Sequence, residues 1–128
     1  MKKFIQTIFV LMILSVAGSG SAFAQKHIMV PAEKADKVMK KRNLEVLDVR
    51  TPEEVQAAHL PDAVNYDFKS ADFESKISAL PRNKPYLVYC RSGVRSGKTV
   101  ELMKSLGFKK IYELQGGIVA YEGAKSKE

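Results

Sequence analysis

The residues of this chain best suited to chemistry lie in one short segment. In order, its members are Cys90, Arg91, Ser92, Gly93, Val94, Arg95 and Ser96. The first is the only cysteine in the chain of 128 residues. A cysteine thiolate is a nucleophile, and arginine guanidinium groups bind anions. The segment therefore predicts nucleophilic attack by Cys90 on an anionic substrate.

The elements on either side of this segment place it where α/β proteins bind ligands. The apolar and aromatic run Tyr86–Tyr89 follows Pro85 and predicts a short strand buried on both faces. Small residues then lead into a helix, so loop amides and the positive end of the helix dipole converge on Cys90 and favour its thiolate. The alternative is that Cys90 is a small core residue. The neighbouring arginines, the glycine and the helix start favour catalysis.

The segment partly resembles two other kinds of active-site loop, but its residue spacing differs from each of them by one position. The end of a Walker A nucleotide-binding loop resembles residues 97–99, but Ser92 stands where that motif needs a glycine, and Gly93 is one residue too close. In a cysteine phosphatase an arginine six residues after the cysteine clamps the phosphate, whereas Arg95 comes five residues after Cys90. A loop shortened by one residue closes a tighter ring of amides, which suits a single sulfur atom better than a tetrahedral phosphate.

The rest of the chain predicts the sheet that would hold this loop. Apolar runs predict strands at residues 27–30, 44–49, 86–89 and 110–114, with a shorter strand ending at residue 66. Helices are expected from Pro31 at N1 to residues 42–43, from a Thr51, Pro52 and Glu54 capping box to Ala58, from a Ser70 cap to Pro81, from the loop to Gly107, and from Gly116 to Tyr121. Residues 124–128 are expected to fray. This alternation predicts a single α/β domain with a mainly parallel central sheet and helices on both faces.

The N-terminus predicts a secretory signal peptide over residues 1–24, followed by a domain over residues 25–128. Two early lysines precede the apolar run 4–17, and Ala22-Phe23-Ala24 is an A-x-A cleavage pattern. The apolar run is shorter than the roughly 20 residues that span a bilayer, which argues against a stable membrane anchor. No cysteine follows it closely, so a lipoprotein anchor has no attachment point. We expect the protein to be periplasmic or secreted.

Charge and cysteine content narrow the class of function further. The chain holds 21 Lys and Arg against 14 Asp and Glu, a formal net charge of +7. The charges are spread along the chain, so a solvated exterior accounts for them better than a nucleic-acid site. In an oxidising compartment cysteines usually pair, so a single cysteine asks for a chemical explanation.

Four segments, taken together, resemble the motifs of rhodanese-family sulfurtransferases. They are CRSGVRS at residues 90–96, DVRTPEE at residues 48–54, AHLPDAVN at residues 58–65 and GGIVAY at residues 116–121. The first looks like the six-residue active-site loop of that family. The family usually has glycine where Ala58 and Asp62 stand, and often tryptophan where Tyr121 stands. The resemblance implies a rhodanese-like fold for the small exported domain.

The resemblance also implies a covalent mechanism at Cys90. The thiolate would attack the outer sulfur of a small-molecule donor such as thiosulfate and hold the sulfur as a persulfide. Cyanide, a thiol or a protein acceptor would then remove it. The loop residues 91–96 would bind the substrate and stabilise the anion with their amides, and Arg91 and Arg95 would add positive charge, unless Arg95 turns outward to hold the loop. This chemistry requires no metal and no organic cofactor.

Most of the other polar and aromatic residues singled out in the sequence are expected to have structural roles. We expect His59 to be a turn histidine bonded to the backbone, because one cysteine and two distant histidines do not make a zinc site. Asp48 and Arg50 are expected to hold the strand end to the neighbouring loop or helix. Lys98 is expected to extend the positive rim of the loop. Core packing is the expected role of Tyr86, Tyr89 and Tyr112.

Two alternatives to a small-molecule enzyme stay open. One is a non-catalytic rhodanese-like binding module, although such modules commonly lack the cysteine that this chain retains. The other is a sulfur carrier whose acceptor is a partner protein.

A first prediction concerns export. The mature protein should begin at Gln25 and be recovered outside the cytoplasm, because the positive start, the apolar run and the cleavage pattern agree. Mass spectrometry of the N-terminal peptide from a periplasmic fraction measures this. A peptide from that fraction that still carries Met1 or Lys2 would contradict the prediction.

Overall fold

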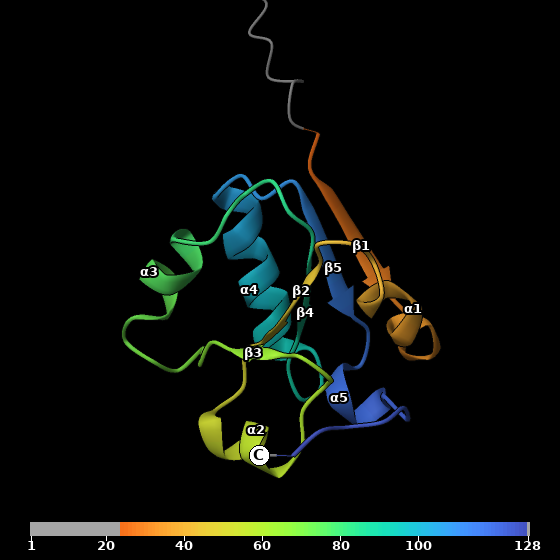
Figure 1. The fold of residues 1–128 in the computed structure, drawn as a ribbon. Helices are drawn as coiled ribbons and strands as arrows, with labels where there is room; N and C mark the ends of the chain where they lie inside the picture. Colours follow the sequence, from red (N-terminus) through yellow and green to blue (C-terminus); the bar gives the residue numbers. More distant parts are fainter. Residues whose placement is uncertain (1–23, 128) are drawn as a thin grey trace, which may run out of the picture.

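A five-stranded parallel sheet forms the centre of the protein in a computed structural model that describes residues 24–127. The signal peptide predicted over residues 1–24 therefore lies almost entirely outside the described residues. The strand order is β1-β5-β4-β2-β3 (Figure 1). The strands are β1 (Lys26–Val30), β2 (Glu45–Asp48), β3 (Val64–Asn65), β4 (Tyr86–Tyr89) and β5 (Lys110–Leu114). All the pairings between these strands are parallel, which confirms the predicted sheet.

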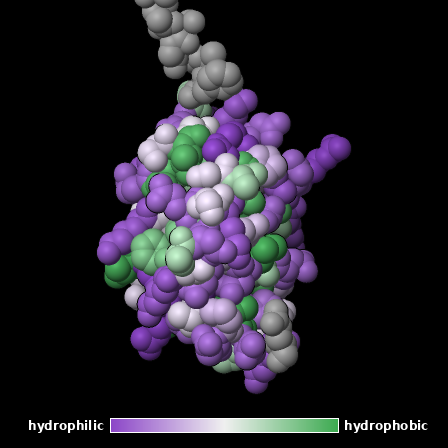
Figure 2. Space-filling view, turned by 90° about the vertical axis from the view of Figure 1, so that its left-hand side faces the viewer, coloured by the Kyte–Doolittle hydropathy of each residue, from purple (hydrophilic) through white to green (hydrophobic). Residues whose placement is uncertain are grey.

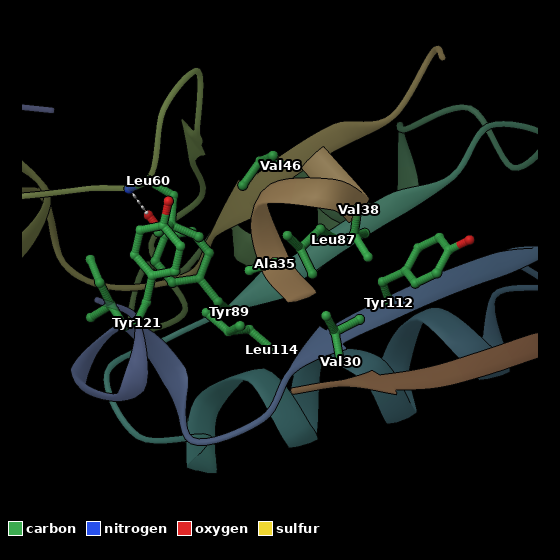
Figure 3. Packing of buried hydrophobic residues seen from close by; sticks show 11 residues of the cluster. Val30, Ala35, Val38, Val46, Leu60, Leu87, Tyr89, Tyr112, Leu114 and Tyr121 are labelled. Carbon is green, nitrogen blue, oxygen red and sulfur yellow. Dashed lines mark hydrogen bonds between the residues drawn. The ribbon is translucent and has the colours of Figure 1, made fainter. Parts of the chain in front are cut away.

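Strand β4 lies at the middle of the sheet, and its side chains alternate between two cores. Tyr86 and Val88 lie in the cluster that also contains Cys90. Leu87 and Tyr89 point to the opposite face, where they join the second cluster (Figure 3). All four strand residues are fully buried, as expected for a parallel strand covered on both sides.

Helices cover both faces of the sheet. They are the 3₁₀ turn η2 (Ala32–Lys34), α1 (Ala35–Met39), α2 (Pro52–Ala57), α3 (Phe73–Ser78), α4 (Val94–Ser105) and α5 (Gly117–Ala120). Helices α1 and α5 contribute to the core on one face, and α3 and α4 contribute to the core on the other. Helix α2 lies beyond the sheet, at the edge where the carboxyl end of β4 lies (Figure 1).

Two predicted helix termini are confirmed in detail. At the start of α2, the Thr51 side chain accepts the Glu54 N–H and the Glu54 side chain reaches back to the Thr51 backbone, which completes the capping box. At the end of α4, Gly107 has a φ of 83° and donates its N–H to Lys104, while Phe108 donates to Met103. These two bonds form a Schellman motif.

Two other helix starts were predicted wrongly. Pro31 has a ψ of 142° and precedes a 3₁₀ turn, so the α-helix begins only at Ala35 and ends at Met39. Ser70 does not cap α3, because its hydroxyl donates to the Asp72 carboxylate. Asp72 itself takes the N-cap position. In both places a local turn occupies the residues that the pattern assigned to the helix.

A contact at Ser126 holds the C-terminal segment to the domain, which contradicts the fraying predicted for residues 124–127; residue 128 lies outside the described residues. Ser126 forms an isolated antiparallel bridge with His59, with N–H to O distances of 2.9 and 2.8 Å. The segment thereby lies beside the end of α2 (Figure 1). The bridge provides hydrogen-bond partners for the backbone N–H and carbonyl of the buried His59. Hydrophobic periodicity does not reveal that Ser126 is this partner.

The three departures from the usual rhodanese motifs fit this fold. Asp62 has a φ of 60°, in the left-handed region that glycine commonly supplies and that aspartate tolerates. Ala58 is extended, with a φ of −167°, so it needs no glycine. Tyr121 is buried in the core, and its hydroxyl donates to Asp36.

The surface seen in Figure 2 is mostly hydrophilic, with small separate patches of apolar residues. Within residues 24–127, no helix has the length and apolar character needed to cross a membrane.

Candidate active site

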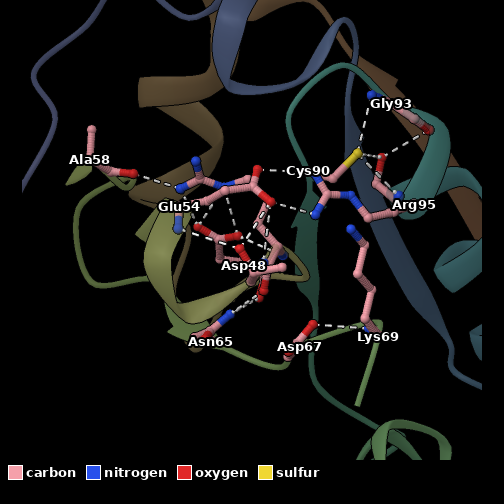
Figure 4. Close-up of polar contacts among 12 residues, drawn as sticks. Asp48, Glu54, Ala58, Asn65, Asp67, Lys69, Cys90, Gly93 and Arg95 are labelled. Carbon is pink, nitrogen blue, oxygen red and sulfur yellow. Dashed lines mark hydrogen bonds and ion pairs between the residues drawn. The ribbon is translucent and has the colours of Figure 1, made fainter. Parts of the chain in front are cut away.

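The Cys90 sulfur lies in a ring of hydrogen-bond donors at the carboxyl end of β4. The backbone N–H groups of Gly93 and Ser96 lie with their nitrogens 3.1 and 3.3 Å from the sulfur (Figure 4). The Ser96 hydroxyl oxygen is 3.4 Å from it. Cys90 is only 1% exposed, so these groups replace water around the sulfur. Such a ring stabilises negative charge on the sulfur.

The balance of burial and hydrogen bonding lowers the pKa of the Cys90 thiol. Burial acts to raise this pKa, but the Ser96 hydroxyl and the backbone N–H groups of Ser96, Gly93 and Ser92 outweigh it by favouring the thiolate. In the structure the Ser96 hydroxyl donates to the Gly93 carbonyl, 3.2 Å away. Its single hydrogen can turn to the sulfur once the thiol loses its proton.

Gly93 gives the loop its turn. Its φ of 118° lies in a region that side chains other than glycine rarely adopt. It is also the N-cap of the twelve-residue helix α4, whose first turn contains no acidic residue. The positive end of the helix dipole therefore faces the sulfur without a competing carboxylate in that turn.

Helix α5 holds the first residues of the loop from behind. The N–H groups of Ile118 and Val119 donate to the carbonyls of Cys90 and Arg91 at 3.0 and 3.2 Å. The close approach requires glycine at position 117, because a Cβ there would lie 2.2 Å from the Arg91 carbonyl oxygen. The φ of Gly117 is also positive, at 64°. The Gly-Gly pair of the last motif thus positions the loop.

Arg95 braces the loop against α2. Its Nη1 and Nη2 atoms lie 2.7 and 3.0 Å from the two carboxylate oxygens of Glu54, a bidentate ion pair (Figure 4). The hydrogen bond from Arg95 lowers the pKa of Glu54 to about 2. Because the same Glu54 completes the capping box with Thr51, the helix start and the loop are joined through one carboxylate. The pair is the contact expected of an arginine that holds the loop, the second of the two roles predicted for Arg95.

A buried polar network fixes the neighbouring strand end. The Arg50 Nη2 atom donates to Asp48 at 2.7 Å and to the Ala58 carbonyl at 2.6 Å. The Tyr89 hydroxyl donates to the same Asp48 carboxylate. It also accepts the Leu60 N–H at 3.0 Å (Figure 3). Asp48 and Arg50 therefore hold the strand end in place, as expected from the sequence.

Sequence reasoning missed two members of this network. The Tyr89 ring packs in the core as predicted, but the bridging role of its hydroxyl was not foreseen. The Asn65 side chain donates to the carbonyls of Asp48 and Arg50 at 3.0 and 2.8 Å. The only sequence signal for either residue is its position, because Asn65 and Tyr89 each end a short strand with a polar group.

The remaining candidates separate into near and distant residues. A pocket of about 640 Å³ opens beside the loop, and both Arg91 and Arg95 line it. Lys98 does not line this pocket, contrary to the expectation, because its side chain borders a separate hollow with Phe68. The His59 Nδ1 atom lies 3.0 Å from the Val55 carbonyl, which confirms that it is a turn histidine bonded to the backbone.

Comparison with known protein families gives a match over most of the described chain. The rhodanese-like domain family matches residues 31–124. This range contains the loop, both strand ends of the polar network and the glycine pair of α5.

Three relatives carry two kinds of name. YtwF of Bacillus subtilis, named as a sulfurtransferase, is 35% identical over 77% of this chain and 91% of its own length. MoeZ of Mycobacterium tuberculosis, named as an adenylyltransferase/sulfurtransferase, is 31% identical over 83% of this chain, which spans only 27% of that protein. The tRNA uridine(34) hydroxylase of Pelagibacter ubique is 30% identical over 81% of this chain and 35% of its own length.

Solved structures agree on the fold. A rhodanese-related protein from Thermoplasma volcanium has a TM-score of 0.70 and 28% identity, over 79% of this chain and 99% of that one. A rhodanese from E. coli, solved with anions, has a TM-score of 0.56 and 28% identity, over 66% of this chain and 99% of that one.

The hydrogen bonds to the sulfur predict how Cys90 reacts with an alkylating agent. Because the folded-state pKa is lowered, the thiolate forms at lower pH than in an ordinary cysteine, and the rate with iodoacetamide should rise at correspondingly lower pH. Ser96→Ala should slow the reaction at pH 7 by at least about tenfold, since a hydrogen bond to a charged group contributes about 1.5–3 kcal/mol. Ser105→Ala, at the exposed end of the same helix, is the control and should react as the wild type does. Equal pH–rate profiles for all three proteins would refute the role of Ser96.

Proposed function

Because this chain belongs to the rhodanese-like domain family, we propose that it is a sulfurtransferase that works through a persulfide on Cys90. The donor is a sulfane-sulfur compound such as thiosulfate, and the acceptor is thiophilic, either cyanide or a thiol. The observation that carries the proposal is the pair of backbone N–H groups, of Gly93 and Ser96, that donate to the Cys90 sulfur, with the Ser96 hydroxyl oxygen 3.4 Å away.

The first half-reaction loads the cysteine. The Cys90 thiolate attacks the outer sulfur of thiosulfate and forms the new sulfur–sulfur bond. The bond inside thiosulfate breaks, and sulfite leaves with its electron pair. The lowered thiol pKa supports this step, because it raises the thiolate fraction at neutral pH.

The second half-reaction unloads it. The ring of donors stabilises the negative charge of the persulfide as it does that of the thiolate. The acceptor attacks the outer sulfur, the bond to Cys90 breaks, and its electron pair returns to the cysteine. Neither step needs a general acid, because sulfite and the Cys90 thiolate are both good leaving groups.

We assign donor capture to Arg91. It is exposed, lines the pocket beside the loop, and has no ion-pair partner within residues 24–127. Arg95, by contrast, is occupied by Glu54. A free guanidinium beside the loop suits an anionic donor such as thiosulfate.

A rhodanese-like binding module without turnover is the alternative function. The retained Cys90 and its ring of donors favour catalysis, because a recognition loop has no need of a stabilised thiolate. Some relatives are named as tRNA hydroxylases. This chain spans only 35% of the one from Pelagibacter ubique, so that name does not carry over to this chain.

We also propose that the reaction takes place in the periplasm or outside the cell. This rests on the sequence of residues 1–24, with its positive start, apolar run and cleavage pattern.

The central test is mass spectrometry of the intact protein after incubation with thiosulfate alone. The wild type should gain the mass of one sulfur atom, and cyanide or dithiothreitol should remove it as thiocyanate or sulfide. Cys90→Ser is the matched control, because the replacement is nearly isosteric; it should fold, stay at its original mass and show no turnover.

Two results would decide against the proposal. A folded wild-type protein that gains no sulfur from thiosulfate or any other sulfane donor would overturn it. Efficient hydrolysis of a phosphoester by the same protein would restore the phosphatase interpretation. Loading that only a partner protein can discharge would identify a dedicated sulfur carrier.

A further inference from the structure

The pocket beside the loop is larger than thiosulfate or cyanide requires. Its volume of about 640 Å³ lies within the range of about 300–1,000 Å³ that is typical of sites for organic ligands. Its walls include the apolar side chains of Ile118 and Val119, and Val119 is 62% exposed. An inorganic anion gains nothing from an apolar wall, whereas a carbon chain does.

The charged groups that line the pocket leave two cations without a counter-ion. Glu54 pairs with Arg95, and Asp48 pairs with Arg50 behind the wall. Arg91 and Lys125 also line the pocket, and neither has an ion-pair partner within residues 24–127. The pocket thus combines an apolar wall with a positive rim, which together fit an organic anion.

Lys125 is held at this rim by the C-terminal segment. Its neighbour Ser126 makes two backbone hydrogen bonds to His59, at 2.8 and 2.9 Å. On the other side, Tyr121 is anchored through Asp36. Lys125 lies just beyond the match to the rhodanese-like family, which ends at residue 124.

We propose that the pocket receives the sulfur acceptor, and that this acceptor is a small organic thiol bearing a carboxylate. Lys125 and Arg91 bind the carboxylate, and the wall of Ile118 and Val119 receives the carbon chain. The inference rests on the proposed function, since it names the acceptor class for the same Cys90 persulfide. Lys125 is a specificity residue and does not take part in bond making.

The transfer step balances without an oxidant or a reductant. The acceptor thiolate attacks the outer sulfur of the Cys90 persulfide and forms a new sulfur–sulfur bond. The bond between that sulfur and Cys90 breaks, its electron pair stays on the Cys90 sulfur, and the acceptor leaves as an organic persulfide.

The test measures transfer from the preloaded Cys90 persulfide to three thiols of equal length. These are 3-mercaptopropionate, 3-mercaptopropanol and 3-mercaptopropylamine, which are anionic, neutral and cationic at the far end. With rates corrected for thiolate fraction, kcat/KM should fall in that order, by roughly threefold or more per step, because each exposed ion pair contributes up to about 1 kcal/mol. Lys125→Gln should remove most of the preference for the anion.

The matched control is Lys127→Gln, an exposed lysine two residues further along the same segment that does not line the pocket. It should keep the wild-type preference. Discharge by cyanide, whose anion has neither a carbon chain nor a carboxylate to occupy the pocket, should be nearly the same in all three proteins. A wild type that loads with thiosulfate and discharges to cyanide, yet uses the three thiols equally, would overturn this inference alone. A wild type that never loads would overturn the proposed function and the inference with it.

Discussion

The whole site depends on donors that converge on one buried sulfur. Burial alone would raise the pKa of the Cys90 thiol and leave it inert. The Ser96 hydroxyl and the N–H groups of Ser96, Gly93 and Ser92 reverse that outcome, and the Gly93 and Ser96 nitrogens lie 3.1 and 3.3 Å from the sulfur. The fixed backbone dipoles need no rearrangement when charge develops on the sulfur. The remaining structure is best understood as the means of holding a short loop in that shape.

Three separate supports hold the loop, and each comes from a different part of the chain. Helix α5 binds the carbonyls of Cys90 and Arg91. The carboxylate of Glu54 holds Arg95 while it also caps its own helix. The parallel register places Tyr89 beside Asp48, so the strand that carries Cys90 is locked to its neighbour by a buried hydroxyl. Because parallel strands end at one edge of the sheet, all three supports can reach the same loop.

The sequence predicted most local features, with the helix starts at Pro31 and Ser70 as exceptions, and missed the long-range contacts. The capping box at Thr51, the cap at Gly107 and the apolar strands depend on neighbours within a few residues, so spacing reveals them. The pair between Glu54 and Arg95 joins residues that are 41 positions apart in the sequence. Only the folded structure shows that Arg95 is paired and not free. The same holds for the bridge between His59 and Ser126, which places the neighbouring Lys125 at the rim of the pocket. Neither contact produces a periodic pattern in the sequence from which it could be predicted.

The folded loop, and not the cysteine itself, lowers the pKa of the Cys90 thiol. This effect can be measured directly by titrating the thiolate absorbance of Cys90 in the native protein and in the same protein unfolded in urea, with Cys90→Ser as the baseline for tyrosine. The account predicts a lower midpoint in the native protein, since the folded state favours the thiolate. An equal or higher midpoint in the native protein would mean that burial outweighs the ring of donors, and would contradict this role of the loop.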